Sequence, residues 1–125
     1  MTALLVVMLA GAVGVTLRYA LGALITSRAG DGFPWSTLVI NVAGAFAMGV
    51  LVAVLERSDI GGELTRPAIG IGLLGGFTTF SAFALETVSL VEDGYLARAA
   101  AYVGVTNVFG IGALVAGLSV GRQGG

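Results

Sequence analysis

Four long apolar stretches restrict the folds that this 125-residue chain can adopt. They lie at about 3–26, 35–55, 67–91 and 96–120, and each contains 21 to 25 residues. A helix of about 20 mostly apolar residues is long enough to cross the hydrocarbon core of a bilayer. The connections between the stretches are short, so there is no room for a soluble domain. We therefore expect residues 1–125 to form a single all-α domain that crosses the cell (plasma or inner) membrane four times.

The composition agrees with a membrane protein and argues against other classes. Hydrophobic residues make up 57% of the chain, charged residues 10%, and the mean hydropathy is +1.01, far from the values of a soluble domain. With a net charge of -1 and no basic patch, nucleic acid is not an expected partner, whereas the lipid bilayer is. An enzyme is disfavoured because the chain has no histidine or cysteine. The remaining catalytic-looking pair, Ser81 and Glu86, is five residues apart and would point to different sides of a helix.

The third stretch contains an unusual run, GGFTTFS at residues 75–81, near its centre. Each glycine lowers helix propensity by roughly 1 kcal/mol, and the hydroxyl side chains can bond to backbone groups that leave the helical ladder. We predict that the third helix is broken near mid-membrane. Broken helices form ion and substrate sites in transporters, where the irregular backbone lines a cavity or is buried by protein. The alternative is that the glycines only allow neighbouring helices to pack closely.

Several polar and aromatic residues could line a path through the membrane. Asn41 lies seven residues inside the second stretch, where its amide must bond across a helix interface or face a pore. Tyr102 and Thr106 are four residues apart and form a hydroxyl stripe on the fourth stretch. Phe80 and Phe83 are three apart, so both rings project from one face. Such rings are usually core residues, but their positive edges can also replace water around a small anion.

Two charged residues fall inside the apolar stretches. Arg18 lies in the second half of the first stretch, and a buried arginine typically snorkels, pairs or faces a water-filled cavity. It is either an interfacial anchor or a residue that attracts anions at a pore mouth. Glu86 lies five residues from the end of the third stretch, which is shallow enough for its carboxylate to reach the interface.

The arginines that normally set membrane orientation are almost evenly divided. The side with the termini would carry Arg57, Arg66 and Arg122, and the other side Arg28 and Arg98, with Arg18 if it snorkels that way. Orientation follows an excess of basic residues on the cytoplasmic side. Without that excess the chain can insert both ways up, and the two orientations can pair as an antiparallel, dual-topology homodimer. A single topology fixed by some other feature is the alternative.

Three segments together resemble a known family. The runs GAVGVTLRY at 11–19, NVAGAF at 41–46 and GGFTTFSAF at 75–83 look like those of the Fluc (CrcB-type) fluoride channels, and the match covers all four stretches. Members of that family are dual-topology homodimers with two antiparallel pores. The resemblance implies a fluoride-selective channel through which cytoplasmic fluoride leaves the cell passively.

The resemblance also implies roles for individual residues. The residues expected along the fluoride path are Asn41, Phe80, Ser81, Phe83, Tyr102 and Thr106. Arg18 is expected near the aqueous vestibule, and Glu86 matches an acidic residue that modulates conduction. The backbone carbonyls of Gly75 and Thr78 are expected to bind a structural sodium ion (Na+) at the dimer interface. Two departures from the family pattern, Ala82 where threonine is common and Gly110 where serine is common, make the polar track thinner.

Two other function classes stay open at this point. A small dual-topology multidrug exporter would use a membrane-embedded carboxylate to exchange protons for a cation, and Glu86 would be its candidate. Its place near the end of a span, without a cage of Trp or Tyr rings, argues against this class. A membrane assembly subunit would use the glycine-rich faces for packing alone and would show no ion flux.

Overall fold

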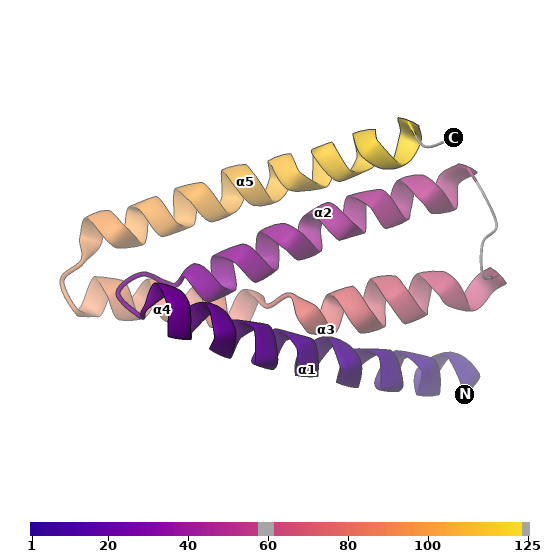
Figure 1. Cartoon of the computed structure of the whole chain (residues 1–125), viewed down its shortest axis with the longest axis horizontal. Coiled ribbons are helices and arrows are strands. Elements are labelled where there is room, and N and C mark those ends of the chain that lie inside the picture. Colours follow the sequence, from indigo (N-terminus) through magenta and orange to yellow (C-terminus); the bar gives the residue numbers. More distant parts are fainter. Residues whose placement is uncertain (58–61, 124–125) are drawn as a thin grey trace.

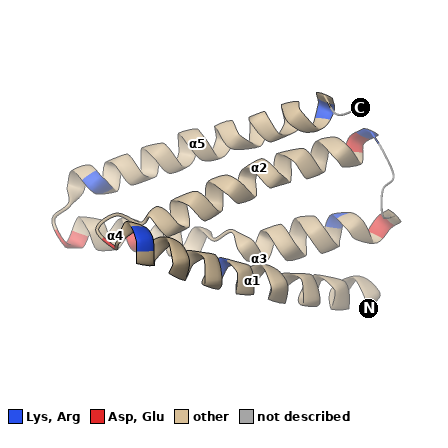
Figure 2. Cartoon of the chain, viewed as in Figure 1, with Lys and Arg blue, Asp and Glu red and all other residues tan. Residues whose placement is uncertain are grey.

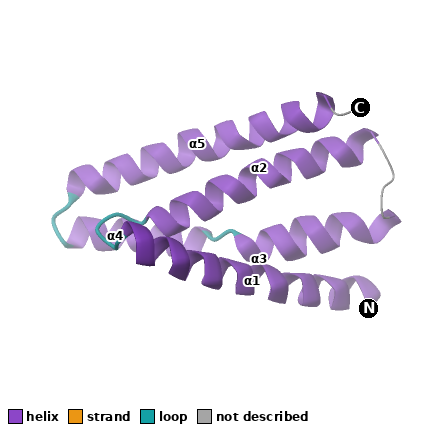
Figure 3. Cartoon of the chain, in the orientation of Figure 1, coloured by secondary structure: helices purple, strands orange, loops and turns teal. Residues whose placement is uncertain are grey.

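The computed structural model describes residues 1–57 and 62–123, and within these ranges every regular element is a helix (Figures 1 and 3). The bundle contains α1 (Thr2–Ala29), α2 (Trp35–Arg57), η1 (Gly62–Leu64), η2 (Arg66–Leu74), α3 (Gly75–Phe77), α4 (Phe80–Glu92) and α5 (Leu96–Gln123). Four segments of the described chain are long and apolar enough to cross a membrane, with Gly62–Glu92 as the third. The prediction of an all-helical protein with four such segments is confirmed. The start of α1 and the end of α5 lie at the same end of the bundle (Figure 1).

Three of the helices extend beyond the apolar stretches by a few residues. The last turns of α1, α2 and α5 contain Arg28, Arg57 and Arg122, respectively. A basic side chain in a last turn interacts favourably with the helix dipole, so the helix does not end where the apolar run ends. Most charged residues lie towards the two ends of the bundle, and one basic residue lies inside α1 (Figure 2). The second connection, expected at Glu56 to Arg66, includes residues 58–61, which lie outside the described residues.

The third span changes its geometry along its length. Segment η2 is a π-helix, with Pro67 in its first turn, and the N–H of Gly75 bonds back to the carbonyls of Gly70 and Gly72. The backbone then becomes extended at Thr78 (φ -88°, ψ 160°) and Thr79 (φ -152°, ψ 122°). The helical ladder is therefore interrupted between α3 and α4, and π-helical turns are frequent beside functional sites.

The two threonines bond to the backbone on either side of this interruption. The Thr78 hydroxyl donates to the Leu74 carbonyl at 3.1 Å, and Thr79 Oγ1 accepts the Ala82 N–H at 3.2 Å. The second bond is an ordinary helix N-cap, in which a side-chain oxygen satisfies one of the free N–H groups of the first turn. Local side-chain chemistry thus ends α3 and begins α4.

Glycines allow the other helices to approach closely. Helix α2 packs most extensively on α5. A Cβ atom at Gly49 would overlap the carbonyl of Leu114, and one at Gly117 would overlap the carbonyl of Phe46. Small residues of this kind let transmembrane helices pack backbone to backbone. On the same helix α2, a Cβ atom at Gly44 would overlap the methyl group of Thr78, so α2 is held against the interruption.

Candidate functional site

Asn41 holds the interruption from the side of α2. Its Nδ2 donates to the Thr79 carbonyl at 2.9 Å, and its Oδ1 accepts the Thr79 N–H at 2.8 Å. Because Thr79 is extended, these two backbone groups have left the helical ladder and need other partners inside a membrane protein. One amide satisfies both. Each amide nitrogen carries two hydrogens, so Asn41 keeps one further N–H with which it can bind something else.

A pocket of about 250 Å³ opens beside this pair. The residues that line it are Asn41, Thr78, Thr79, Phe80, Phe83, Thr106 and Asn107. Four of the residues expected along an anion path therefore meet at one place, although they come from three different spans. Phe80 is 77% exposed in the single chain, so most of its ring surface is left uncovered by the surrounding residues.

Thr106 supplies a hydroxyl group that has no hydrogen-bond partner in the part of the chain that the structure describes. Among the described residues, its Oγ1 is the one buried side-chain polar atom without such a partner. Buried polar groups are normally hydrogen-bonded, and each exception requires an explanation. Thr106 also lines the pocket, so the wall of the site contains a buried hydroxyl group that is not engaged by the described residues.

Aromatic rings continue from the pocket towards one end of the bundle. The Phe80 and Phe83 centroids are 5.7 Å apart, and Phe83 and Tyr102 are 5.0 Å apart. Phe33 then meets Tyr102 edge-on at 5.6 Å, and Trp35 lies 4.8 Å from Phe33. Edge-to-face and tilted contacts at these distances are the favourable arrangements for aromatic pairs. Five rings thus connect the interruption to the α1–α2 connection.

Glu86 lies beside these rings and is bound by two hydroxyl groups. The Thr37 hydroxyl donates to Oε2 at 3.0 Å, and the Tyr102 hydroxyl donates to Oε1 at 2.8 Å. Tyr102 is fully buried and Thr37 is 6% exposed. From its position near the end of the span, Glu86 was expected to reach the interface, but these bonds hold its carboxylate between α2, α4 and α5. A carboxylate accepts such charge-assisted bonds more strongly than a neutral oxygen does.

Arg18 faces the interruption from α1. Its Nε donates to the Gly76 carbonyl at 3.2 Å, and the side chain is partly buried. It also lines a second pocket, of about 390 Å³, to which Thr79 and Glu86 contribute. Arg18 is therefore bonded to the last turn before the interruption and shares a pocket with Glu86.

The carbonyls of Gly75 and Thr78 fit the requirements of a cation site. In a continuous helix the Gly75 carbonyl would accept the Thr79 N–H, but that N–H donates to Asn41. Thr78 is extended, and no side chain among the described residues donates to either carbonyl. Hard cations prefer oxygen ligands such as these. No cluster of three or more His, Cys, Asp or Glu side chains occurs in the described ranges, so a cation here would depend on backbone oxygen.

The remaining predicted positions lie at the edges of the site. Ser81 is exposed, and its Oγ is 3.3 Å from Thr79 Oγ1. It is not among the residues lining the smaller pocket, whereas Ala82 lines the larger one with Arg18. A Cβ atom at Gly110 would meet nothing within 4 Å, so a larger residue would fit there in the single chain.

Three residues of the site were not singled out from the sequence as site residues. Thr37 binds Glu86, Thr79 is bound at both backbone groups by Asn41, and Phe33 covers Tyr102. Thr37 could have been identified from the sequence, because it lies one helical turn before Asn41 and shares its face. In the structure both side chains bind the third span. Phe33 lies in a connection, where no periodicity indicates which way a side chain points.

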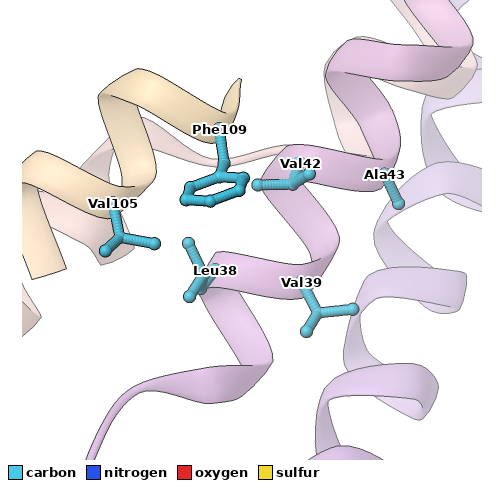
Figure 4. A pocket seen from close by; sticks show the side chains of 6 residues that line it. All are labelled: Leu38, Val39, Val42, Ala43, Val105 and Phe109. Atoms are coloured by element: carbon cyan, nitrogen blue, oxygen red, sulfur yellow. The ribbon is translucent and has the colours of Figure 1, made fainter. Parts of the chain in front are cut away.

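An apolar groove lies on α2 and α5 close to the site (Figure 4). It has a volume of about 390 Å³ and is lined by Leu38, Val39, Val42, Ala43, Val105 and Phe109. Val39 and Phe109 are 43% and 61% exposed in the single chain. An apolar concave face of this kind is suited to lipid tails or to another apolar protein surface.

These features define a multi-pass membrane protein with a polar pocket at an interrupted third span. The family described as "CrcB-like protein, Camphor Resistance (CrcB)" matches residues 5–118, and the chain belongs to this family. Three similar proteins carry the name "Fluoride-specific ion channel FluC". The protein of Novosphingobium aromaticivorans is 48% identical over 124 residues, which cover 98% of both chains. That of Sphingopyxis alaskensis is 46% identical over 123 residues, 98% of both chains.

The third relative, from Paracoccus denitrificans, is 47% identical over 116 residues, which cover 93% of this chain and 91% of its own. This is a family of ion channels and not of enzymes, in agreement with the expectation from the sequence.

Proposed function

We propose that this protein is a fluoride channel through which cytoplasmic fluoride leaves the cell passively. The observation that carries this proposal is the pocket at the interruption. It is lined by the Asn41 amide, the Phe80 and Phe83 rings, and Thr106, whose hydroxyl has no hydrogen-bond partner among the described residues. The names of the relatives point to the same ion.

The chemistry of the pocket suits a small, strongly hydrated anion. A channel must replace the hydration shell of its ion while binding it weakly enough for release. The free N–H of Asn41 and the O–H of Thr106 are donors, and the positive edges of the two phenyl rings add weaker support. Ser81, beside Thr79, adds a further hydroxyl group, and Tyr102, whose hydroxyl donates to Glu86, adds its ring to the same path next to Phe83. Arg18 would raise the local anion concentration at the mouth.

A structural sodium ion is proposed between two protomers, bound by the carbonyls of Gly75 and Thr78. Both carbonyls lie where the helical ladder is interrupted, and no described side chain donates to them. The two carbonyls of each protomer would together provide four oxygen ligands on a shared axis. A bound cation would hold the protomers together and favour an anion nearby.

The channel is proposed to be an antiparallel homodimer with two pores. Phe80 is exposed in the single chain, and the groove on α2 and α5 is apolar (Figure 4). A second protomer would cover both features and would place further side chains around each pore. The nearly even distribution of arginines between the two sides agrees with insertion in both orientations.

Fluoride efflux from liposomes that contain the purified protein tests the proposed function directly. A fluoride electrode should record rapid release, and a matched chloride experiment should record none. Release of neither ion by a verified dimer would contradict the channel function and would leave the assembly-subunit class. Equal release of both ions would contradict selectivity.

Insertion in both orientations predicts the accessibility of a tag at the C-terminus. Such a tag should be labelled by a membrane-impermeant reagent from both sides of the membrane, with about half of the molecules accessible from each. A cytoplasmic protein and a tagged membrane protein of known single orientation serve as controls for leakage. Labelling from one side only would contradict the dual topology.

Replacing Glu86 by glutamine distinguishes the channel from a proton-coupled exporter. Glutamine keeps one acceptor oxygen for the Thr37 and Tyr102 hydroxyls but removes the negative charge. We expect fluoride efflux to change by less than about tenfold, which corresponds to ~1.4 kcal/mol in the barrier. An exporter would instead lose its proton-coupled transport completely. Complete loss of fluoride efflux in a folded Glu86→Gln dimer would contradict a merely modulating role.

A further inference from the structure

We propose that Arg18 is a positioning residue, which holds the interruption of the third span in place through its bond to the Gly76 carbonyl; this inference rests on the channel function proposed above. The bond joins residues 58 positions apart in the sequence, at 3.2 Å. In this role Arg18 affects fluoride conduction by fixing the backbone geometry of the interruption. Its hydrogen-bond donor is therefore more important for conduction than its positive charge.

The bond depends on a face of α1 that fits the third span backbone to backbone. Gly11, Gly14 and Arg18 are spaced by three and four residues, so they share one face. A Cβ atom at Gly14 would overlap the Leu73 carbonyl, and one at Gly76 would lie 2.8 Å from the Gly11 carbonyl oxygen. One turn further along α1, the Arg18 side chain reaches the last residues of α3.

The Gly76 carbonyl needs a donor because of the interruption. In a continuous helix it would accept the N–H of the residue four positions later, Phe80. The extended backbone at Thr78 and Thr79 moves Phe80 out of that position. An unsatisfied carbonyl inside a membrane protein is costly, and Arg18 Nε supplies the missing bond.

Two side chains from two helices therefore hold the two sides of the interruption. Arg18, on α1, binds the last turn before it, and Asn41, on α2, binds Thr79 within it. The carbonyls of Gly75 and Thr78 receive no side-chain donor in the described chain, and they are the two proposed for the cation. Arg18 thus fixes which carbonyls are engaged and which remain available.

Three substitutions at Arg18 distinguish the effect of its hydrogen-bond donor from the effect of its positive charge. In glutamine, Nε2 is the same number of bonds from Cα as the arginine Nε that makes this contact, so Arg18→Gln keeps a donor and removes the charge. Arg18→Met has a similar length and neither property, and Arg18→Lys keeps the charge with a different donor position. We expect Arg18→Gln to retain at least about tenfold more fluoride efflux than Arg18→Met. Equal efflux from these two variants, with efflux retained in Arg18→Lys, would overturn the proposal and favour a purely electrostatic role.

A spectroscopic measurement tests the bond independently of flux. Glycine precedes phenylalanine at 32–33 and at 76–77, so ¹³C-carbonyl glycine combined with ¹⁵N phenylalanine selects two carbonyls in the membrane-reconstituted protein. Phe33→Leu removes the first and assigns the second to Gly76. The Gly76 signal should shift in Arg18→Met and remain close to its parent position in Arg18→Gln. An unchanged signal in Arg18→Met would overturn the proposal.

The bond between Arg18 and Gly76 can also be tested in the parent protein, without any substitution at Arg18. Magnetisation transfer between arginine ¹⁵Nε and the Gly76 carbonyl carbon should be detected, because the bond places them in direct contact. Its absence would overturn the proposal even where a variant failed to assemble. Failure of the proposed channel function can be distinguished from failure of this inference. If the channel function is wrong, the parent protein releases no fluoride, whatever the spectra show.

Discussion

Phe83→Ile is expected to reduce fluoride efflux at least about tenfold, and Phe80→Ile should have an effect of similar size. Both rings line the pocket at the interruption, and their centroids are 5.7 Å apart. Isoleucine fills part of the same volume but has no ring edge to face an anion. Loss of an aromatic interaction worth ~1–1.5 kcal/mol at the barrier corresponds to a reduction of about fivefold to tenfold, and displacement of the neighbouring ring adds to it.

The measurement is efflux per reconstituted dimer, with the elution volume of each variant checked by size exclusion. Phe46→Ile is the matched control, because Phe46 lies on α2, is 39% exposed and lines none of the pockets described above. It should conduct like the parent. If Phe80→Ile and Phe83→Ile also conduct like the parent, the rings serve only for packing and the ring-edge mechanism is wrong.

The four spans were predictable because the bilayer imposes a simple requirement on the sequence. Every lipid-facing backbone group must bond within its own helix, so a long apolar stretch has one stable conformation. The ends were less predictable. Hydropathy placed the end of the first stretch at residue 26, whereas α1 continues to Ala29 with Arg28 in its last turn. A charge ends an apolar run in the sequence, but a snorkelling side chain does not end a helix.

The polar contacts between spans were only partly predictable. Asn41 was expected either to bond across a helix interface or to face a pore, and the sequence could not choose between them. In the structure its amide bonds to Thr79 in the third span and also lines the pocket. Thr37 and Asn41 lie one helical turn apart and so share a face. No local pattern indicates which residues, 49 and 38 positions away, this face meets.

Arg18 and Glu86 illustrate the limit of arguments from depth alone. Glu86 was located by its distance from the end of a span, which predicts a reach towards the interface. Arg18 was expected to be either an interfacial anchor or a residue at a pore mouth. In the structure Arg18 binds the Gly76 carbonyl, and Glu86 binds two hydroxyl groups. A long side chain can turn inwards whenever a partner is available there, and only the tertiary structure shows the partner. Phe33 shows the same limit for a ring in a connection.

Asn41→Leu is expected to cause a large loss of stability together with loss of fluoride efflux. The Asn41 amide is the partner of both the N–H and the carbonyl of Thr79, at 2.8 and 2.9 Å. Leucine has a similar volume but leaves both backbone groups without this partner. Each unsatisfied buried group costs ~1–3 kcal/mol, so we expect the free energy of unfolding to fall by roughly 2–5 kcal/mol.

Thermal unfolding in detergent, followed by far-UV circular dichroism, measures this loss, and Asn107→Leu provides the matched control. Asn107 is exposed and its side chain donates to the Val103 carbonyl of its own helix, so the same chemical change there should alter stability little. Because Asn107 also lines the pocket, this variant is a control for stability and not for efflux. A folded Asn41→Leu dimer with the stability of the parent and no fluoride efflux would mean that Asn41 acts on the anion alone. Loss of both stability and fluoride efflux would instead mean that the Asn41 amide is needed to form the interruption. Phe80 and Phe83 lie on α4, which begins directly after Thr79, so their positions depend on the backbone that Asn41 binds.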